Sequence, residues 1–342
     1  MPQTRTSISP RGRWLPGEHL PRTGTKALNE SLANLSQPVY VVDVDGHLGV
    51  AQDGTAGMDP SPSTDGNSYP LLAWAPPLSL ESLGDPGFKS DHGLKYAYVC
   101  GAMANGITST AMVEAAASAG MLGFFGAGGL SIGQIEAAID TLQRGPTPLP
   151  FGFNLIHSPH DPTLEQKTVD LYIARGVRLV SASAFLDLTT PLVEYRIHGI
   201  HRDQNGRIVC PNRVIAKVSR EEVARKFFSP PPDKHLRLLL EQDKISAEQA
   251  DLARQIPMAQ DLTAEADSGG HTDNRPALCL FPTMTALRDE FADRYAYPLR
   301  VGLAGGIATP ASAAAAFAMG AAYILTGSIN QACVEADTST LV

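Results

Sequence analysis

The stretch from Arg300 to Ser328 constrains the fold more than any other part of the chain. It reads as a strand, a Gly305-Gly306 turn, an alanine-rich helix, a second strand and then Gly327-Ser328. In a TIM barrel the loops after strands 7 and 8 commonly bind a phosphate through backbone N–H groups, and glycine permits the close approach. Two ordinary βα turns would look similar, but the spacing of both turns favours a phosphate site.

Short apolar runs alternate with helical patterns from Tyr96 onward, which is typical of βα units and a parallel sheet. Eight such runs predict an α/β protein with a closed TIM (β/α)8 barrel over residues 93–342. A doubly wound open sheet is the alternative, but its glycine-rich turn would normally follow the first strand. The predicted strands are residues 96–101, 122–125, 151–155, 179–181, 213–217, a segment near 258–261, 300–304 and 322–325.

Residues 1–92 differ in pattern from the rest and predict a small N-terminal lobe with a linker into the barrel. Within them, residues 39–44 and 47–51 flank Asp45-Gly46, which is the signature of a β-hairpin. A second departure from the βα rhythm lies between the fifth and sixth strands. There, residues 232–256 predict two short amphipathic helices, an insertion that could serve as a lid, a partner-binding face or plain surface.

The chain is acidic, with 27 Lys and Arg against 35 Asp and Glu and a formal net charge of −8. A nucleic-acid partner is therefore not expected, because phosphate backbones require a basic surface. No apolar run approaches the roughly twenty residues of a membrane span, and the N-terminus lacks the apolar core of a signal peptide. The dispersed Cys100, Cys210, Cys279 and Cys333 predict reduced, mostly buried thiols in a cytoplasmic protein without a metal site.

The block from Glu265 to Pro276, EADSGGHTDNRP, is expected to form the loop after the sixth strand on the catalytic face of the barrel. Its His271 follows two glycines, so the backbone can turn sharply and hold the imidazole over the barrel mouth. A histidine there could act as a general acid or base near neutral pH. A structural histidine that is hydrogen-bonded to Asp267 or Asp273 is an equal interpretation of this motif taken alone.

Other candidate residues lie at predicted strand ends. The small-residue turn around Met103 and Ala104 offers a surface for a flat ring, and Asn154 can both donate and accept at a heteroaromatic edge. Lys217 could place a cation beside an electron-rich ring or a phosphate. Each has a structural alternative (a capped turn, a capping amide, a surface lysine), and the functional interpretation rests on their common face.

Four segments, in order, closely resemble the PfaD-type enoyl reductases. These act in trans on polyunsaturated fatty acid and polyketide synthases and are relatives of the FMN-dependent nitronate monooxygenases. The resemblance extends from about residue 70 to the C-terminus and is weaker before that. The segments are YAYVCGAMANGITSTAMVEAAASAGMLGFFGAGGL, NRVIAKVSREEVARKFF, EADSGGHTDNRP and RVGLAGGIATPASAAAAFAMGAAYILTGSINQACVEA.

The resemblance implies an FMN-dependent TIM barrel that reduces an enoyl thioester held on an acyl carrier protein, with NADPH or NADH as hydride donor. It implies that His271 is the catalytic histidine. It also implies the residues that bind FMN: Gly305, Gly306, Gly327 and Ser328 for the phosphate, and Met103, Ala104, Asn154, Lys217 and Gly270 for the ring and ribityl chain.

Two alternative functions remain open, an oxygen-using nitronate monooxygenase and a non-catalytic docking subunit of a synthase. The basic residues after the fifth strand predict a docking surface for an acidic carrier protein, with a solvated helix face as an equal interpretation. They are Arg213, Lys217, Arg220, Arg225 and Lys226.

Family members continue well beyond the eighth strand, so we expect this chain to lack the closing helix of the barrel and, as a result, to aggregate or to bind FMN poorly. Uncovered apolar surface on the last and first strands is the reason for that expectation. The sequence leaves the acyl substrate, the choice of nicotinamide and the oligomeric state open, with a homodimer among the options.

Overall fold

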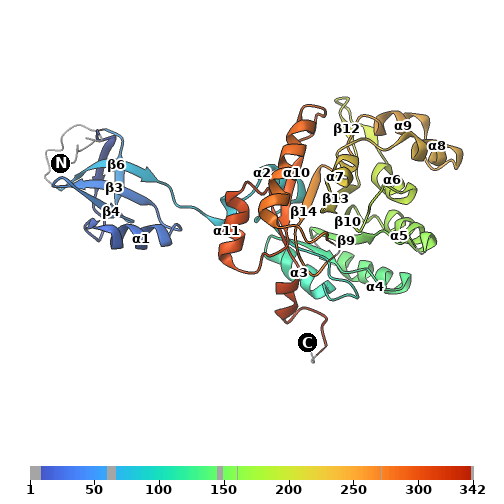
Figure 1. The fold of residues 1–342 in the computed structure, drawn as a ribbon, viewed down its shortest axis with the longest axis horizontal. Helices are drawn as coiled ribbons and strands as arrows, with labels where there is room; N and C mark the ends of the chain where they lie inside the picture. The colour runs from blue at the N-terminus through green and yellow to red at the C-terminus, as the bar shows by residue number, and fades with distance from the viewer. Residues whose placement is uncertain (1–8, 60–66, 145–148, 160, 271, 340–342) are drawn as a thin grey trace. The chain divides into compact units, whose positions relative to one another are not determined.

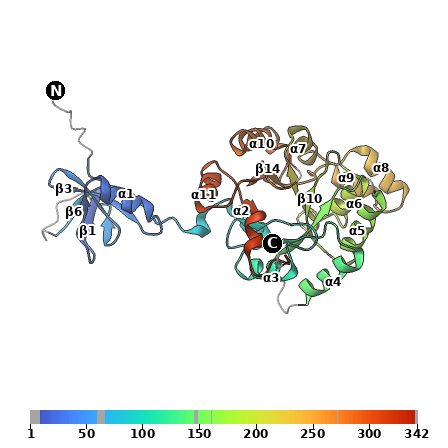
Figure 2. The same ribbon diagram turned by 60° about the horizontal axis from the view of Figure 1, so that its bottom comes forward.

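The computed structural model describes residues 9–59, 67–144, 149–159, 161–270 and 272–339. The chain divides into two compact units, Met1–Ser82 and Leu83–Val342 (Figures 1 and 2). The sequence analysis placed this boundary after residue 92. The structure places it earlier because α2 (Pro86–His92) is bound to the strands of the barrel.

The N-terminal unit is a six-stranded antiparallel sheet, in the order β2-β4-β3-β6-β1-β5, with the helix α1 (Thr25–Ala33). The predicted hairpin is confirmed as β3 and β4, and Asp45 and Gly46 at its turn have φ angles of 51° and 82°. Trp14 and Tyr40 anchor the separate apolar core of this unit. The strands are β1 (Gly12–Leu15), β2 (Arg22–Thr23), β3 (Val39–Val44), β4 (His47–Ala51), β5 (Thr55–Gly57) and β6 (Tyr69–Ala75).

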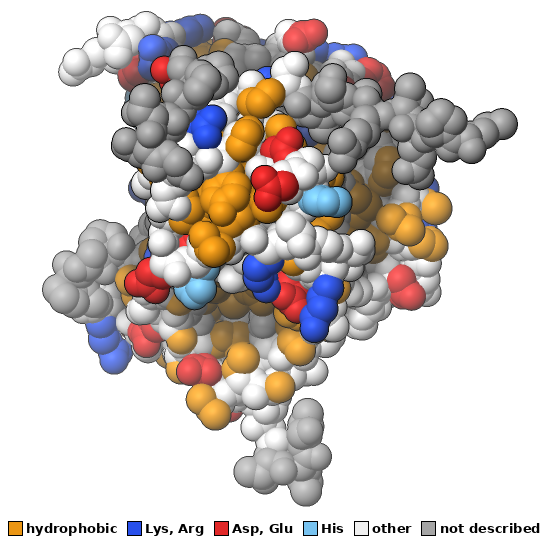
Figure 3. All heavy atoms as spheres, turned by 90° about the vertical axis from the view of Figure 1, so that its left-hand side faces the viewer, with side chains coloured by type: hydrophobic (Ala, Val, Ile, Leu, Met, Phe, Trp, Pro, Cys, Tyr) orange, Lys and Arg blue, Asp and Glu red, His pale blue; other side chains and the backbone are white. Residues whose placement is uncertain are grey.

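Most of the large hydrophobic side chains that are exposed among the described residues belong to the N-terminal unit. Orange apolar side chains are visible at the surface in the space-filling view of Figure 3. Within α1, Leu28 and Leu32 are one helical turn apart and both exposed, whereas Ala27 and Ser31 form the buried face. The exposed set in this unit is Leu15, Leu20, Leu28, Leu32, Leu35, Leu48, Met58, Trp74, Leu78 and Leu80.

The second unit is a closed eight-stranded barrel with every neighbouring pair of strands parallel, as predicted. The sixth strand begins at Asp261, where the sequence suggested that it would end. The preceding Met258 and Ala259 are buried, and their N–H groups donate to the carbonyls of Ser229 and Phe227. They are therefore apolar because they pack in the core before the strand and not because they belong to it. The strands are β7 (Tyr98–Cys100), β8 (Leu122–Phe125), β9 (Phe151–Ile156), β10 (Leu179–Ser183), β13 (Arg213–Val218), β14 (Asp261–Glu265), β15 (Arg300–Ala304) and β16 (Ile324–Thr326).

Helices alternate with these strands and cover the outside of the barrel (Figures 1 and 2). Ser109, Ser131 and Thr189 cap α3, α4 and α6 by accepting a hydrogen bond from a first-turn N–H, which favours helix initiation. The helices are α3 (Thr110–Ser118), α4 (Ile132–Gln143), α5 (Pro162–Ala174), α6 (Thr190–Ile197), α7 (Glu221–Phe227), α10 (Ala277–Ala292) and α11 (Pro310–Ala318).

The predicted helical insertion between the fifth and sixth strands is confirmed as α8 (Asp233–Glu241) and α9 (Ala247–Ala253). A two-stranded ribbon of β11 (His201–Arg202) and β12 (Ile208–Val209) was not predicted, because its strands are too short to show a pattern. A 3-10 helix, η1 (Leu80–Ser82), ends the N-terminal unit, and another, η2 (Ser328–Ala332), follows β16. The residues after η2 bond back to the β7–α3 turn, where the Asp337 N–H donates to the Ile107 carbonyl.

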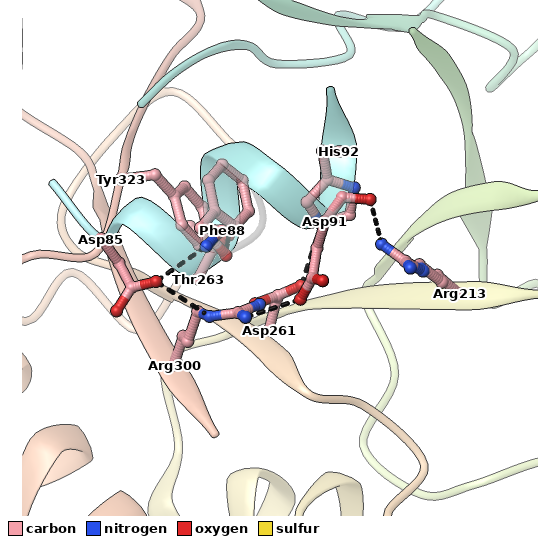
Figure 4. Close-up of polar contacts among 9 residues, drawn as sticks. All are labelled: Asp85, Phe88, Asp91, His92, Arg213, Asp261, Thr263, Arg300 and Tyr323. Atoms are coloured by element: carbon pink, nitrogen blue, oxygen red, sulfur yellow. Dashed lines mark hydrogen bonds and ion pairs between the residues drawn. The ribbon is translucent and has the colours of Figure 1, made fainter. Parts of the chain in front are cut away.

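An ion network around the buried Arg300 and Asp261 closes the N-terminal end of the barrel (Figure 4). The Arg300 guanidinium, only 3% exposed, pairs with carboxylates of Asp85 at 3.1 Å, Asp91 at 2.6 Å and Asp261 at 3.1 Å. The Nε2 atom of His92 lies 3.0 Å from the other oxygen of Asp261. The network therefore joins α2 to the first residues of β14 and β15.

An aromatic stack lies beside these ions. The Phe88 ring of α2 stacks on Tyr323 with ring centroids 4.1 Å apart, and the Tyr323 hydroxyl bonds to Thr263 Oγ1 at 2.8 Å (Figure 4). Phe88 and Tyr323 are both fully buried. The helix α2 is thus a plug that closes the barrel by apolar packing as well as by charge.

The charge of Asp261 links the stability of the barrel to pH. Burial raises the pKa of Asp261, but the hydrogen bond with His92 and the charge of Arg300 outweigh it, so the pKa lies below 3.8. Because this pKa is lower in the folded state, ionised Asp261 stabilises the fold above about pH 4. The stabilisation is lost as the pH falls through the folded-state pKa. We expect Asp261→Asn to lower the free energy of unfolding at pH 7, with a gap to wild type that narrows toward pH 3. Urea denaturation at pH 7 and pH 3 measures the difference in unfolding free energy between wild type and variant. An equal difference at both pH values would contradict the prediction.

Candidate functional site

All of the predicted site residues that the structure describes lie at the C-terminal ends of the barrel strands or in the loops that follow. Because the eight strands are parallel, these ends meet at one mouth of the barrel, opposite the plug α2. The residues are Met103 and Ala104 after β7, Asn154 on β9, Lys217 on β13, Gly270 after β14, Gly305 and Gly306 after β15, and Gly327 and Ser328 after β16.

The turns after β15 and β16 leave backbone donors unused. Among the described residues, no acceptor pairs with the N–H groups of Gly305, Gly306 or Gly327. Gly305 and Gly306 have φ angles of +91° and +71°, and a Cβ on Gly305 would lie 2.6 Å from the Ala266 carbonyl oxygen. Unused N–H groups on adjacent turns form a concave site that suits a phosphate.

The loop after β14 reaches the same turns. A Cβ built on Gly269 would lie 3.9 Å from Ser328 Oγ, so the two loops are neighbours. The N–H of Ala266 donates to the Ala304 carbonyl at 2.9 Å, which holds the start of the loop beside the end of β15. The structure therefore brings the loop that contains Gly270 close to the turns of Gly305 and Ser328, and their shared role at a cofactor stays a prediction.

The β7–α3 turn is held rigidly by Thr108, a residue that the sequence analysis did not single out. Its hydroxyl accepts from the Met103 N–H at 2.9 Å and donates to the Gly101 carbonyl at 2.8 Å. A Cβ on Gly126 would overlap the Met103 carbonyl oxygen, so the neighbouring loop packs directly on this turn. Met103 is half-buried and Ala104 is exposed, which leaves a fixed surface of small groups at the mouth.

Within the described part of the chain, the side-chain amide of Asn154 uses its oxygen in a hydrogen bond but leaves its Nδ2 donor unpaired. Its side chain is 5% exposed, and its Oδ1 atom accepts from the Ala127 N–H at 2.6 Å. No acceptor for its Nδ2 group is found among the described residues. Asn154 also lines a cavity of about 90 Å³ together with Gly128 and Gly129. A buried amide donor of this kind can bind the edge of a ring.

Lys217 lies in the barrel mouth and not on the outer surface. Its Nζ atom is 2.8 Å from Glu265 Oε1, and the two side chains are only 13% and 8% exposed. A Cβ on Gly270 would lie 2.9 Å from the same oxygen, so Glu265 also supports the loop above it. The sequence analysis predicts no role for Glu265, although a carboxylate at the end of the strand LTAE is a signal for such a partnership.

His271 lies outside the described residues, so its predicted catalytic role stays a prediction. The loop around it is tied at two places. The Asp267 N–H donates to the Arg275 carbonyl at 3.0 Å, and Asp273 accepts from Arg220 Nε and Nη2, both at 2.8 Å. The hydrogen bond from Arg220 is the main reason that the pKa of Asp273 is lowered.

A second histidine, His157, lies at the mouth, and the sequence predicts no role for it. His157 follows β9, and its Nδ1 lies 2.9 Å from Glu165 Oε2; the Glu165 side chain is 3% exposed. The other oxygen of Glu165 accepts from Thr189 Oγ1. The His157 ring packs on Phe185, with centroids 5.3 Å apart. This chain of contacts was missed because its members lie on three separate segments.

The five basic residues after the fifth strand do not form a free cationic surface. Arg213 and Lys217 lie at opposite ends of β13, and Arg213 bonds to the Asp91 carbonyl in the plug network (Figure 4). Arg225 pairs with Glu221 and Glu290, and Lys226 with Asp187. The grouping of these five residues into one patch is therefore wrong, because Arg213 and Lys217 lie at opposite ends of a strand and the other three are paired with carboxylates. Docking of a carrier protein stays a prediction.

The cysteines are less buried than predicted. Burial raises the pKa of the Cys100 thiol to about 11, and Cys210 is half-buried, but Cys279 and Cys333 are exposed. All four are free thiols. Within the described part of the chain, no three His, Cys, Asp or Glu residues come together as a metal site. Nor does that part contain a helix with the length and apolar character needed to span a bilayer.

Comparison with known proteins relates both units to proteins of fatty acid and polyketide biosynthesis. Residues 21–77 match the N-terminal domain of the fatty acid synthase subunit PfaD. The chain is 50% identical over 271 residues to the polyketide biosynthesis protein PksE of Bacillus subtilis, covering 78% of this chain and 35% of PksE. It is 39% identical over 349 residues to one subunit of the polyunsaturated fatty acid synthase of Thraustochytrium sp., covering 98% of this chain and 23% of that relative. The chain thus spans about a third or less of these relatives' lengths.

Among solved structures, the enoyl reductase domain of MlnA, from the macrolactin biosynthesis cluster of Bacillus amyloliquefaciens, superposes with a TM-score of 0.74. It is 43% identical, and the match covers 77% of this chain and 60% of that one. A point mutant of FabK from Thermotoga maritima has the same fold, with a TM-score of 0.52 at 24% identity over 75% of this chain and 69% of that one.

Proposed function

With a PfaD N-terminal domain and a barrel similar to that of an enoyl reductase, this chain is of the PfaD type, and we propose that it is a trans-acting, FMN-dependent enoyl reductase. Its substrate is an enoyl thioester on the acyl carrier protein of a polyunsaturated fatty acid or polyketide synthase. The hydride donor is NADPH or NADH. The observation that carries this proposal is the set of unused N–H groups at Gly305, Gly306 and Gly327, on the same mouth as Lys217 and Asn154.

These residues fit FMN in chemistry and position. The free N–H groups after β15 and β16, with Ser328, would hold its phosphate. The Nδ2 donor of Asn154 and the Lys217 ammonium would hold polar edges of the ring, and the turn at Met103 and Ala104 would lie against its flat face. When bound, FMN would supply the hydride-transfer chemistry between the nicotinamide and the β-carbon of the enoyl thioester.

The protein's own groups orient the reactants and manage charge. Lys217 places a positive charge in the mouth, and Glu265 holds its ammonium in position. Gly270 lets the loop that carries His271 lie close over that ion pair. We assign to His271 one of two roles, either to orient the thioester or to handle a proton in the reaction. This assignment follows the resemblance to the nitronate monooxygenase-like barrels.

Anaerobic absorbance spectroscopy tests the function directly. We expect NADPH or NADH to bleach the flavin of the protein once it is reconstituted with excess FMN, and an enoyl thioester added next to restore the colour. An alkyl nitronate should not bleach it. Bleaching by the nitronate and not by the nicotinamides would assign the chain to the monooxygenases. A protein that binds no flavin would overturn the proposal.

The Lys217–Glu265 pair allows flavin binding to be separated from folding. Removing one partner leaves a buried charge unpaired, so Lys217→Met is expected to cost about 3 kcal/mol of unfolding free energy and to weaken FMN binding. The double variant Lys217→Met, Glu265→Gln should regain most of the stability but not the affinity. Denaturant titration and flavin fluorescence measure the two quantities. Recovery of both together would show that Lys217 does not contact the cofactor.

A further inference from the structure

A groove opens at the barrel mouth between the loops that follow β10 and β13. Its cavity has a volume of about 280 Å³. Lys217 lines its inner end, and the loop residues Ala184 and Leu186 line one side. In the order of the barrel, β10 and β13 are the fourth and fifth strands, across the ring from the phosphate-binding turns of the seventh and eighth.

Half of the residues that line the groove are apolar, and the other half are polar or charged, namely Lys217, Ser219, Arg220, Thr272 and Asp273. Phe185, Val218 and Val223 line it and are 4%, 5% and 3% exposed, so each presents a face to the cavity while the rest of the side chain packs in the core. Leu186 lines it as well but is 59% exposed. An apolar ligand group that covered Leu186 would remove its side chain from water, which favours binding.

The groove is also held in shape before any ligand arrives. The His157 ring packs on Phe185, and His157 is itself fixed by the buried Glu165. Ala184 has a φ angle of +63°, a conformation that is strained for alanine and that persists only where the surroundings enforce it. Such strain is concentrated at ligand and active sites.

The charged groups around the groove are already paired with one another. Lys217 is bound to Glu265 at its inner end. Arg220 is bound by two hydrogen bonds to Asp273 at its rim, where both residues line the cavity. An anionic ligand would have to break one of these pairs, whereas an uncharged apolar chain would leave both intact.

We propose that this groove binds the acyl chain of the thioester substrate. The inference rests on the proposed reductase function and adds where the chain lies and which residues select its length. The carbons next to the thioester would lie near Lys217, in the mouth, and the distal carbons would run along Phe185 and Val223 to Leu186 at the open end. Longer chains then gain affinity by covering Leu186.

A series of enoyl thioesters of rising chain length on one small carrier thiol tests the groove. Each methylene that becomes buried improves binding by up to about fourfold, so the KM of wild type should fall stepwise with chain length. The exposed Leu186 can be changed without disturbing the core. Leu186→Glu should abolish the dependence on the distal carbons, and Leu186→Ala should reduce it. A matched control is Leu238→Glu, an exposed leucine on α8 that does not line the groove, which should retain the wild-type series.

The outcomes separate the groove from the function. If Leu186→Glu keeps the wild-type chain-length series, the acyl groove is wrong while the reductase stands. If the variant loses activity only with carrier-bound substrate, equally at all chain lengths, the groove holds the carrier's arm and the acyl assignment is overturned. If no thioester of any length reoxidises the reduced wild-type flavin, the proposed function itself fails.

Discussion

Arg300→Met is expected to unfold the barrel or to bring it close to unfolding. The substitution keeps the apolar stem but leaves the carboxylates of Asp85, Asp91 and Asp261 without their common cation, and Asp261 is buried. Breaking a buried ion pair from one side typically costs about 3–5 kcal/mol. Domains of ordinary stability have about 5–15 kcal/mol in total, so the loss would be a large part of it.

Circular dichroism during urea titration measures this loss. Tryptophan fluorescence would not, because Trp14 and Trp74 are the two tryptophans of the chain and both lie in the N-terminal unit. The matched control is Arg254→Met, which removes a surface arginine that pairs with Asp233 and Asp251. Exposed pairs contribute at most about 1 kcal/mol, so this variant should stay near wild type. Equal effects of the two substitutions would show that the plug network does not stabilise the barrel.

The second large effect is expected at Gly305. A valine there must adopt a φ angle near +91°, and its Cβ would lie 2.6 Å and 2.7 Å from the carbonyl oxygen and carbon of Ala266. The β14–α10 loop and the turn after β15 would have to separate, and the two sets of N–H groups would no longer face one phosphate. Strain of about 1–3 kcal/mol adds to that loss. We expect Gly305→Val to weaken FMN binding by at least about a hundredfold, since each 1.4 kcal/mol is a factor of ten.

Flavin fluorescence titration of the apoprotein gives the affinity of the Gly305 variant. Gly133→Ala is the matched glycine substitution, because it lies within α4 and a Cβ there would have no atom within 4 Å. Alanine is favoured over glycine inside a helix, so this variant should bind FMN normally and unfold at slightly higher denaturant. Wild-type affinity in the Gly305 variant would place the cofactor phosphate elsewhere.

The barrel and the glycine turns after β15 and β16 could be predicted because their signals are local. A run of apolar residues followed by two glycines predicts a strand and a turn from neighbouring residues alone. The strand at Arg300–Ala304 agrees with the predicted residues. The plug network could not be predicted in this way. Arg300 and Asp91 are far apart in the sequence, and only the closed ring of strands brings α2 beneath β14 and β15.

The error about the basic residues has a geometric cause. Arg213 and Lys217 are four residues apart, and a strand rises about 3.3 Å per residue, so their side chains serve opposite ends of the barrel. Counting charges along the sequence treats them as neighbours. The same lack of spatial information concealed the partnership of Lys217 with Glu265, which depends on the parallel pairing of β13 with β14.

The separate cores of the two units define a point at which such proteins can be recombined. The cluster around Trp14 shares no residue with the barrel clusters, so an exchange of N-terminal units between related proteins that cuts after Ser82 preserves the apolar clusters of the described residues. A cut after His92, which the sequence pattern suggests, would instead give the barrel a foreign plug. Chimaeras joined there would have to supply their own partners for Arg300 and Tyr323.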